Sequence, residues 1–186
     1  MSTSDIARAL AGFIDAIDSE ALKDVARHWG DICKPDGPPG WSDIRPAAIK
    51  LHLPIVWSYE YLPGEDDFVG RLAGYQITGL SNKPFKGTRL SELRPDDKYP
   101  RSLIRAKRAL QEPALYRGQG LVYKSADSYG VGERIVMPIY GRGAQRSGVF
   151  GATQYKAITE WAASRTEAET EDWHSLAGIF APVVCS

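Results

Sequence analysis

The chain has 186 residues, of which 43% are hydrophobic and 25% are charged, and this composition predicts a globular protein with a packed core. Its 23 lysines and arginines balance its 23 aspartates and glutamates, so net charge gives no reason to expect binding to nucleic acid or to a membrane surface. The two cysteines, Cys33 and Cys185, lie far apart and form no Cys-x-x-Cys pair, which argues against a disulfide scaffold or a cysteine zinc site and fits a reducing compartment.

The first thirty residues predict an amphipathic helical segment. Apolar residues recur at steps of three and four from Ile6 to Trp29, on one stripe that must pack on its own domain or on a partner chain. Asp18-Ser19 can cap a second helix, so one long helix and two joined helices both fit. Acidic residues interrupt the apolar pattern, unlike a signal peptide, and no apolar run approaches the roughly 20 residues of a membrane span. We therefore expect a cytoplasmic protein.

The turn-rich stretch CKPDGPPGW, residues 33–41, separates this N-terminal segment (1–30) from a central domain (31–156). Proline positions, alternation of apolar residues and helical spacing predict the elements of the domain. In chain order they are a short helix at 42–54, a hairpin of strands at 55–61 and 68–75, short helices and loops, a helix at 96–112, and strands at 115–124, 133–140 and 147–155. A helical tail is predicted over 157–186, with four apolar side chains available for packing: Trp161, Trp173, Leu176 and Phe180.

Four stretches of this domain resemble a bacterial PAS-like family, of alphaproteobacterial type and long catalogued as a domain of unknown function. They are WSDIRPAAIKLHLPIVW (41–57), FVGRLAGYQI (68–77), FKGTRLSEL (85–93) and RIVMPIYGRGAQRSGVFG (134–151). The resemblance covers roughly Trp29 to Tyr155, and its most specific parts are the arginine-then-glycine strand and the GTRLSEL phrase.

The resemblance implies an α+β fold: a PAS-like five-stranded antiparallel sheet with helices packed on one face, plus N-terminal and C-terminal helical extensions. It also implies a sensory or protein-interaction module that holds a small ligand or cofactor between sheet and helices. PAS domains commonly dimerise through a helix before the first strand, a role that the resemblance gives to residues 1–30. The flavin-reactive cysteine phrase of light-sensing PAS domains is not matched by Cys33 or Cys185, and the sequence names no cofactor.

Arg71 is the first candidate site residue, since it lies within a predicted strand. An inward-facing guanidinium needs either a carboxylate, such as Glu60 or Glu92, or a bound anion, whereas an outward-facing one needs neither. Both readings stay open at this point.

Aromatic residues on or near the predicted sheet are candidates to line a ligand pocket or to fill a core without a ligand. They are Trp57, Tyr59, Phe68, Tyr75, Tyr123 and Phe150. A basic stripe on the helix at 96–112 is a candidate site for an acidic partner or nucleotide, or a solvated face. Its members are Lys98, Arg101, Arg105 and Arg108.

Signatures of catalysis or metal binding are not found in the sequence. The three histidines are scattered, and no two have the spacing of metal ligands. His52 is a candidate axial haem ligand, but it precedes the first predicted strand and lies outside the elements that would line the pocket. The glycine pairs lack the context of a phosphate loop, and no nucleophile elbow occurs. We therefore expect no enzyme but a stand-alone PAS-like regulatory module, a homodimer that signals by binding a partner protein. The alternatives are an α+β cone- or barrel-type enzyme and a ligand-free structural adaptor.

Overall fold

A computed structural model describes most of the chain as helices and strands. The described residues are 3–35, 37–79, 83–94, 99–124, 129–141, 146–164, 166 and 169–179. The helices are α1 (Thr3–Ala16), α2 (Glu20–Asp31), the 3-10 helix η1 (Pro46–Ile55), α3 (Tyr75–Thr78), α4 (Leu90–Leu93), α5 (Tyr99–Gln111) and α6 (Glu160–Ala163). The strands are β1 (Val56–Leu62), β2 (Asp67–Ala73), β3 (Ala114–Lys124), β4 (Tyr129–Tyr140), β5 (Arg146–Ile158) and β6 (Thr170–Ser175). Across these residues, no helix combines the length and the apolarity that crossing a membrane requires.

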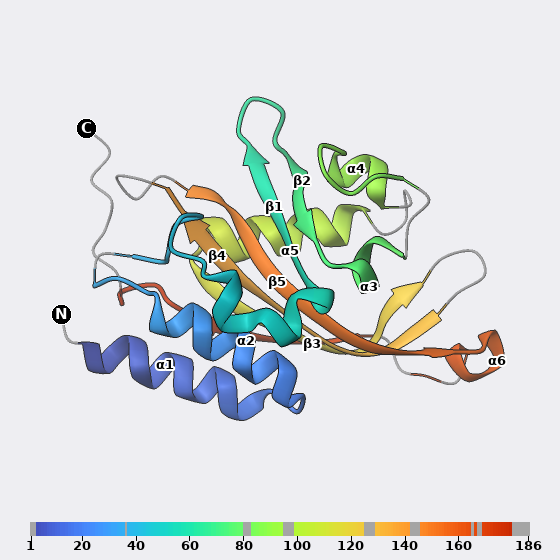
Figure 1. Ribbon diagram of the computed structural model, residues 1–186, viewed down its shortest axis with the longest axis horizontal. Helices are drawn as coiled ribbons and strands as arrows, with labels where there is room; N and C mark the ends of the chain where they lie inside the picture. The colour runs from blue at the N-terminus through green and yellow to red at the C-terminus, as the bar shows by residue number, and fades with distance from the viewer. Residues whose placement is uncertain are drawn as a thin grey trace.

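The strands of the described chain form one antiparallel sheet in the order β2-β1-β5-β4-β3-β6 (Figure 1). The predicted α+β class with a single antiparallel sheet is thereby confirmed. The predicted number of five strands is wrong, because a sixth strand, β6, pairs with β3 from Ala114↔Ser175 to Gln119↔Thr170.

The predicted helical tail over residues 157–186 is also wrong in its described part. The chain continues as β5 to Ile158, makes one helical turn in α6, and returns as β6. In β6, the ring of Trp173 contacts Tyr116 on one face of the sheet, and the ring of His174 contacts Phe13 on the other. Only an extended segment places neighbouring side chains on opposite faces, so these contacts outweigh the helical spacing of the tail. Phe180, assigned to the same helix, lies outside the described residues.

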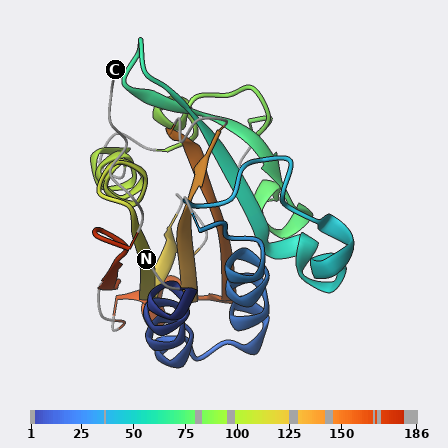
Figure 2. The same ribbon diagram turned by 90° about the vertical axis from the view of Figure 1, so that its left-hand side faces the viewer.

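Helices cover both faces of the sheet, which corrects the prediction of helices on one face. The helices α1, α2 and η1 pack on one face, and α3, α4 and α5 pack on the other (Figure 2). Strand β4 serves both cores, since Ile135 and Met137 point into the first and Val136 and Tyr140 into the second. A strand buried on both faces reads as a continuous apolar run, and the residues IVMPIY of β4 have this composition.

The first thirty residues fold as two helices: α1 ends at Ala16, and Ser19 caps the start of α2. The Ser19 side chain accepts a hydrogen bond from the backbone N–H of Leu22. The buried carboxylate of Glu133 on β4 accepts hydrogen bonds from the backbone N–H groups of Asp18 (3.1 Å) and Ser19 (2.9 Å). The turn between α1 and α2 is therefore fixed to the sheet.

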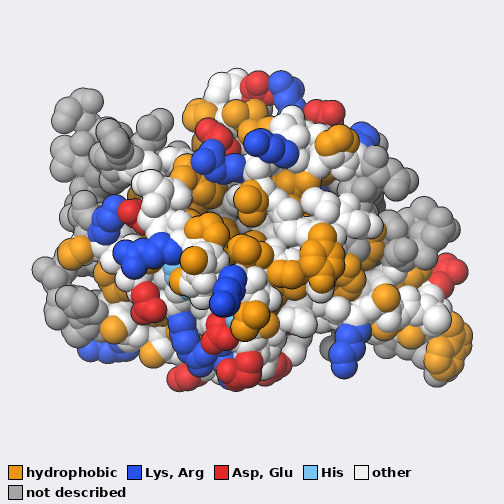
Figure 3. Space-filling view, in the orientation of Figure 1, with side chains coloured by type: hydrophobic (Ala, Val, Ile, Leu, Met, Phe, Trp, Pro, Cys, Tyr) orange, Lys and Arg blue, Asp and Glu red, His pale blue; other side chains and the backbone are white. Residues whose placement is uncertain are grey.

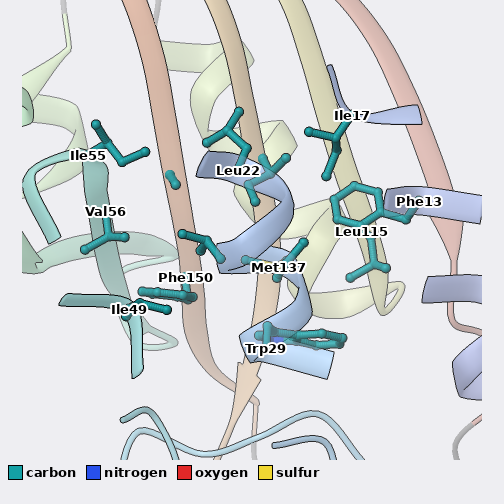
Figure 4. Close-up of a cluster of buried hydrophobic side chains, with 14 of the residues drawn as sticks. Phe13, Ile17, Leu22, Trp29, Ile49, Ile55, Val56, Leu115, Met137 and Phe150 are labelled. Atoms are coloured by element: carbon teal, nitrogen blue, oxygen red, sulfur yellow. The ribbon is translucent and has the colours of Figure 1, made fainter. Parts of the chain in front are cut away.

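The apolar stripe of these two helices packs on the sheet of the same chain. Figure 4 shows Phe13, Leu22 and Trp29 among the side chains of the strands. Trp29 has no exposed surface, and its indole N–H donates a hydrogen bond of 3.0 Å to the carbonyl of Pro138. The stripe that the resemblance assigns to dimerisation is thus buried within one chain. Homodimerisation stays a prediction, but a dimer would have to use a surface other than this buried stripe.

Two histidines in this core make stability depend on pH. Burial lowers the pKa of His28, which accepts a hydrogen bond from the backbone N–H of Arg45, and burial also lowers the pKa of His174. Both side chains bind protons more readily in the unfolded chain, whose histidine pKa is about 6.5. Their neutral forms therefore stabilise the fold fully above about pH 6.5, and this contribution is lost as the pH falls below that value.

We expect the midpoint of thermal unfolding to fall between pH 7.5 and pH 5.5. The double variant His28→Gln, His174→Gln is expected to lose a large part of this fall, since glutamine does not titrate. The variant His52→Gln is a matched control, because it removes a histidine outside this core, whose ring lies 3.0 Å from the carboxylate of Asp24. Equal slopes for all three proteins would contradict the assignment to His28 and His174.

Candidate functional site

A small cavity lies between the sheet and the helices α4 and α5. Strands β1 and β4 contribute side chains to its floor, and residues of α4 and α5 and the position after α4 form its roof. Its volume is about 30 Å³, enough for one or two water-sized groups. The lining residues are Trp57, Tyr59, Leu90, Arg94, Ser102, Arg105, Ala106, Arg134 and Val136.

Guanidinium groups from three different elements meet at this cavity. Arg134 comes from β4, Arg105 from α5, and Arg94 from the residue after α4. The side chains of Arg105 and Arg134 are only 7% and 9% exposed. The Nε atoms of all three arginines are buried, and none has a hydrogen-bond partner among the described residues.

Within the described part of the chain, a single buried carboxylate, that of Glu169, pairs with two of these arginines, Arg105 and Arg134. Its Oε2 accepts a hydrogen bond of 3.0 Å from Nη2 of Arg105, and its Oε1 accepts one of 3.1 Å from the hydroxyl of Tyr116. Nε of Arg134 lies 2.9 Å from Oε1, but the direction of its N–H does not suit a hydrogen bond. This contact is therefore an ion pair without a directed bond.

Gly118 on β3 gives the carboxylate of Glu169 its access to the cluster. Gly118 pairs with Arg134 on one side and with Glu171 on the other. A Cβ atom at position 118 would lie 2.3 Å from Oε1 of Glu169 and 2.4 Å from the hydroxyl oxygen of Tyr116. Any side chain at this position would displace the acid.

Burial and neighbouring cations govern the electrostatics of the cavity. Burial lowers the pKa of Arg134 to about 10, with the charges of Arg105 and Arg94 acting in the same direction and Glu169 opposing them. Arg134 remains a cation at neutral pH even so. Burial raises the pKa of Tyr59 and of Tyr116, so both hydroxyl groups stay protonated.

The predicted aromatic set is divided among different places. Trp57 and Tyr59 line the cavity. Phe68 is fully buried in the same core but not among the lining residues, and Phe150 points into the opposite core. Tyr75 is 71% exposed. Tyr123 packs on Tyr155, with 6.0 Å between ring centroids, and does not line the cavity.

Arg71 lies at the surface and not at the cavity. Its guanidinium is 3.4 Å from the carboxylate of Glu60 and stacks over the ring of Trp41, with 4.8 Å to the ring centroid. The contacts of Arg71 thus match the interpretation as a salt bridge to Glu60. Its position gives no support to the interpretation as a contact to a bound anion.

The basic stripe is also divided. Arg105 points to the cavity, whereas Arg101 pairs with Glu171 at 2.9 Å. Arg108 pairs with Glu112 and stacks on Trp173. Lys98 lies outside the described residues.

Three members of the cluster were not among the predicted site residues: Arg94, Arg134 and Glu169. For Arg134 the signal is its place directly before the apolar run IVMPIY, where a charge within a buried strand needs a specific partner. Glu169 gives no such signal, because its segment was predicted to be helical.

Another hollow, shallow in form, lies beside the turn between α1 and α2. It has a volume of about 510 Å³ and is lined by the turn, by Gln119 and Gly120 on β3, and by parts of β4 and β5. Its buried acid, Glu133, is already paired with Arg117 and with backbone N–H groups. The acid of this hollow is thus satisfied by a structural network, whereas the cavity beside α4 and α5 contains arginine N–H donors without a described acceptor.

Metal and haem sites have no support from the geometry. The ring of His52 lies 3.0 Å from Asp24, away from the cavity. Among the residues that the structure describes, no group of three or more His, Cys, Asp or Glu side chains is arranged to hold a metal ion.

A scan against protein-family models and a search of curated proteins found no match to the chain.

Proposed function

We propose that the chain is a PAS-like sensory and regulatory module, which binds a small molecule at the cavity and signals through contact with a partner protein. The cavity between the sheet and α4–α5 is the observation that carries this proposal. Aromatic and apolar side chains line it together with a few polar groups from both the sheet and the helices, a combination typical of ligand sites. The strand order β2-β1-β5-β4-β3 supports the PAS-like assignment, since a PAS sheet pairs its five strands in this order.

An exposed apolar surface supports the part of the proposal that concerns a partner protein. Leu51 on η1, Leu72 on β2 and Tyr75 on α3 are 79%, 51% and 71% exposed. Their elements contact one another, and Figure 3 shows hydrophobic side chains gathered over this part of the molecule. Exposed apolar groups that gather on one face are typical of protein contact sites. A ligand would alter such a contact only by binding two arrangements of the helices with different affinity.

The geometry favours this proposal over an enzyme of the cone or barrel type. Such an enzyme would enclose a histidine and a carboxylate within a curved sheet. Here the described sheet is open, with β2 and β6 at its edges, and the described residues that line the cavity include neither a histidine nor a carboxylate.

Native mass spectrometry of the freshly purified chain tests the ligand part of the proposal. We expect a bound small molecule, which is lost in the variant Ser102→Leu because the larger side chain fills the cavity. Ile104→Leu is the matched control, since it places the same side chain two positions along α5, where Ile104 is 65% exposed. Absence of any bound mass, together with no binding from a library of small metabolites, would favour the ligand-free adaptor instead.

A further inference from the structure

Among the residues that the structure describes, the arginines that line the cavity outnumber the carboxylates paired with them. Within the described chain, three guanidinium groups surround the cavity, and the carboxylate of Glu169 is shared between two of them. The next acid, Glu171, is 33% exposed and 3.6 Å from Arg105, and it also pairs with Arg101. Buried charges are unfavourable unless they are paired, so this arrangement favours the entry of a negative group.

The hydrogen-bond donors are not satisfied either. Each guanidinium has five N–H donors, and the Nε donors of Arg94, Arg105 and Arg134 have no acceptor. The carboxylate of Glu169 already accepts hydrogen bonds from Arg105 and from the hydroxyl of Tyr116, and it forms an ion pair with Arg134. Nearby Asp67 is also occupied, by the backbone N–H of Phe68 and the hydroxyl of Ser91.

The size of the cavity suits a small charged group. A volume of about 30 Å³ holds one or two water-sized groups, such as two oxygens of a carboxylate or of a phosphate. Guanidinium groups match the planar or tetrahedral oxygens of such anions with paired N–H donors. Trp57 and Tyr59 provide an aromatic wall beside these donors.

We propose that the cavity binds the oxyanion group, carboxylate or phosphate, of a small ligand, with Arg94, Arg105 and Arg134 as its donors. This inference rests on the proposed sensory function and specifies the chemical class of its ligand. Arg105 is the member of the predicted basic stripe that takes part.

Thermal unfolding of the full chain at constant ionic strength tests the inference, with sodium phosphate, sodium acetate or sodium succinate replacing sodium chloride. We expect a saturable rise of the unfolding midpoint with phosphate or with a carboxylate, of about 5–10 °C at a hundred times the dissociation constant. The anion that acts at the lower concentration identifies the source of the oxyanion. A rise that does not saturate, or that is equal for all salts, would overturn the inference.

Arg94→Gln is the variant of choice, because Arg94 is less buried than the other two arginines and the variant is expected to fold. We expect it to weaken anion binding at least tenfold, whereas Arg108→Gln, which changes an exposed arginine on α5, changes binding less than twofold. Titration of the wild-type chain with phosphate gives a second measurement, in which the arginine Nε–H resonances of the cluster shift in nuclear magnetic resonance spectra. Equal binding by wild type and Arg94→Gln would overturn the inference.

The native mass spectrum separates the two proposals. A bound neutral molecule that is displaced by Ser102→Leu would overturn the oxyanion inference and support the sensory function. If neither an anion nor any other small molecule binds, both are wrong.

Discussion

Replacing Glu169 by glutamine is expected to lower the free energy of unfolding by about 3–5 kcal/mol, because breaking a buried ion pair leaves its cations without compensation. The carboxylate is 7% exposed and contacts Arg105 and Arg134, which are buried as deeply. Unfolding in urea, followed by circular dichroism, measures the change. Glu171→Gln is the matched control, since this partly exposed acid lies two residues further along and should cost less than about 1 kcal/mol.

The same variant gives a second and opposite expectation for ligand binding. Without the Glu169 carboxylate, a phosphate or carboxylate ligand meets less repulsion at the arginines, so Glu169→Gln should bind the anion more tightly than the wild type while being less stable. Anion titrations at a temperature where both proteins are folded measure this difference. Weaker anion binding by Glu169→Gln would show that the acid shapes the site and does not merely balance its charge.

Replacing Trp29 by alanine is expected to destabilise the chain by about 3–5 kcal/mol, as for other large buried aromatic side chains. The indole has no exposed surface and fills the core between α2 and the sheet, where it also donates a hydrogen bond to Pro138. Trp29→Phe keeps much of the packing and should cost less. Trp161→Ala is the control at an exposed tryptophan, with an expected change within about 0.5 kcal/mol. Equal stability of the two alanine variants would mean that α2 does not depend on the sheet, and would return its apolar stripe to the role of a dimer surface.

Local patterns predicted much of the fold. Alternating residues and a turn signal placed the hairpin, which the structure has as β1 and β2 joined after Leu62. Helical spacing placed α5 within three residues of its observed bounds, Tyr99–Gln111. In each case the pattern and its stop signal lie in one stretch of the chain, so no distant contact is needed to interpret them.

The parts that failed depend on distant contacts. The segment TEDWHS is short and polar, and it becomes a strand because it pairs with β3 and places Trp173 and His174 on opposite faces. Likewise, helices on both faces of the sheet bury β4, and its apolar run IVMPIY fits this burial without indicating which helices cover each face.

The candidate site was predicted only in part for the same reason. Trp57, Tyr59 and Arg105 were among the candidates and line the cavity. The acid that pairs with Arg105 and Arg134 depends on the register of β3 with both of its neighbours and on a glycine between them. No spacing within the sequence encodes such a pairing.

The position of Glu169 beside the last described strand has a consequence for the order in which the protein is built. A ribosome makes α5 and β4, with Arg105 and Arg134, before it makes the acid that neutralises them. Until β6 adds to β3, closing α5 over the sheet would bury both cations without their counter-ion, which is unfavourable. We therefore expect α5 to pack on the sheet only after β6 has paired with β3. In a nascent chain halted before Glu169, α5 should remain undocked.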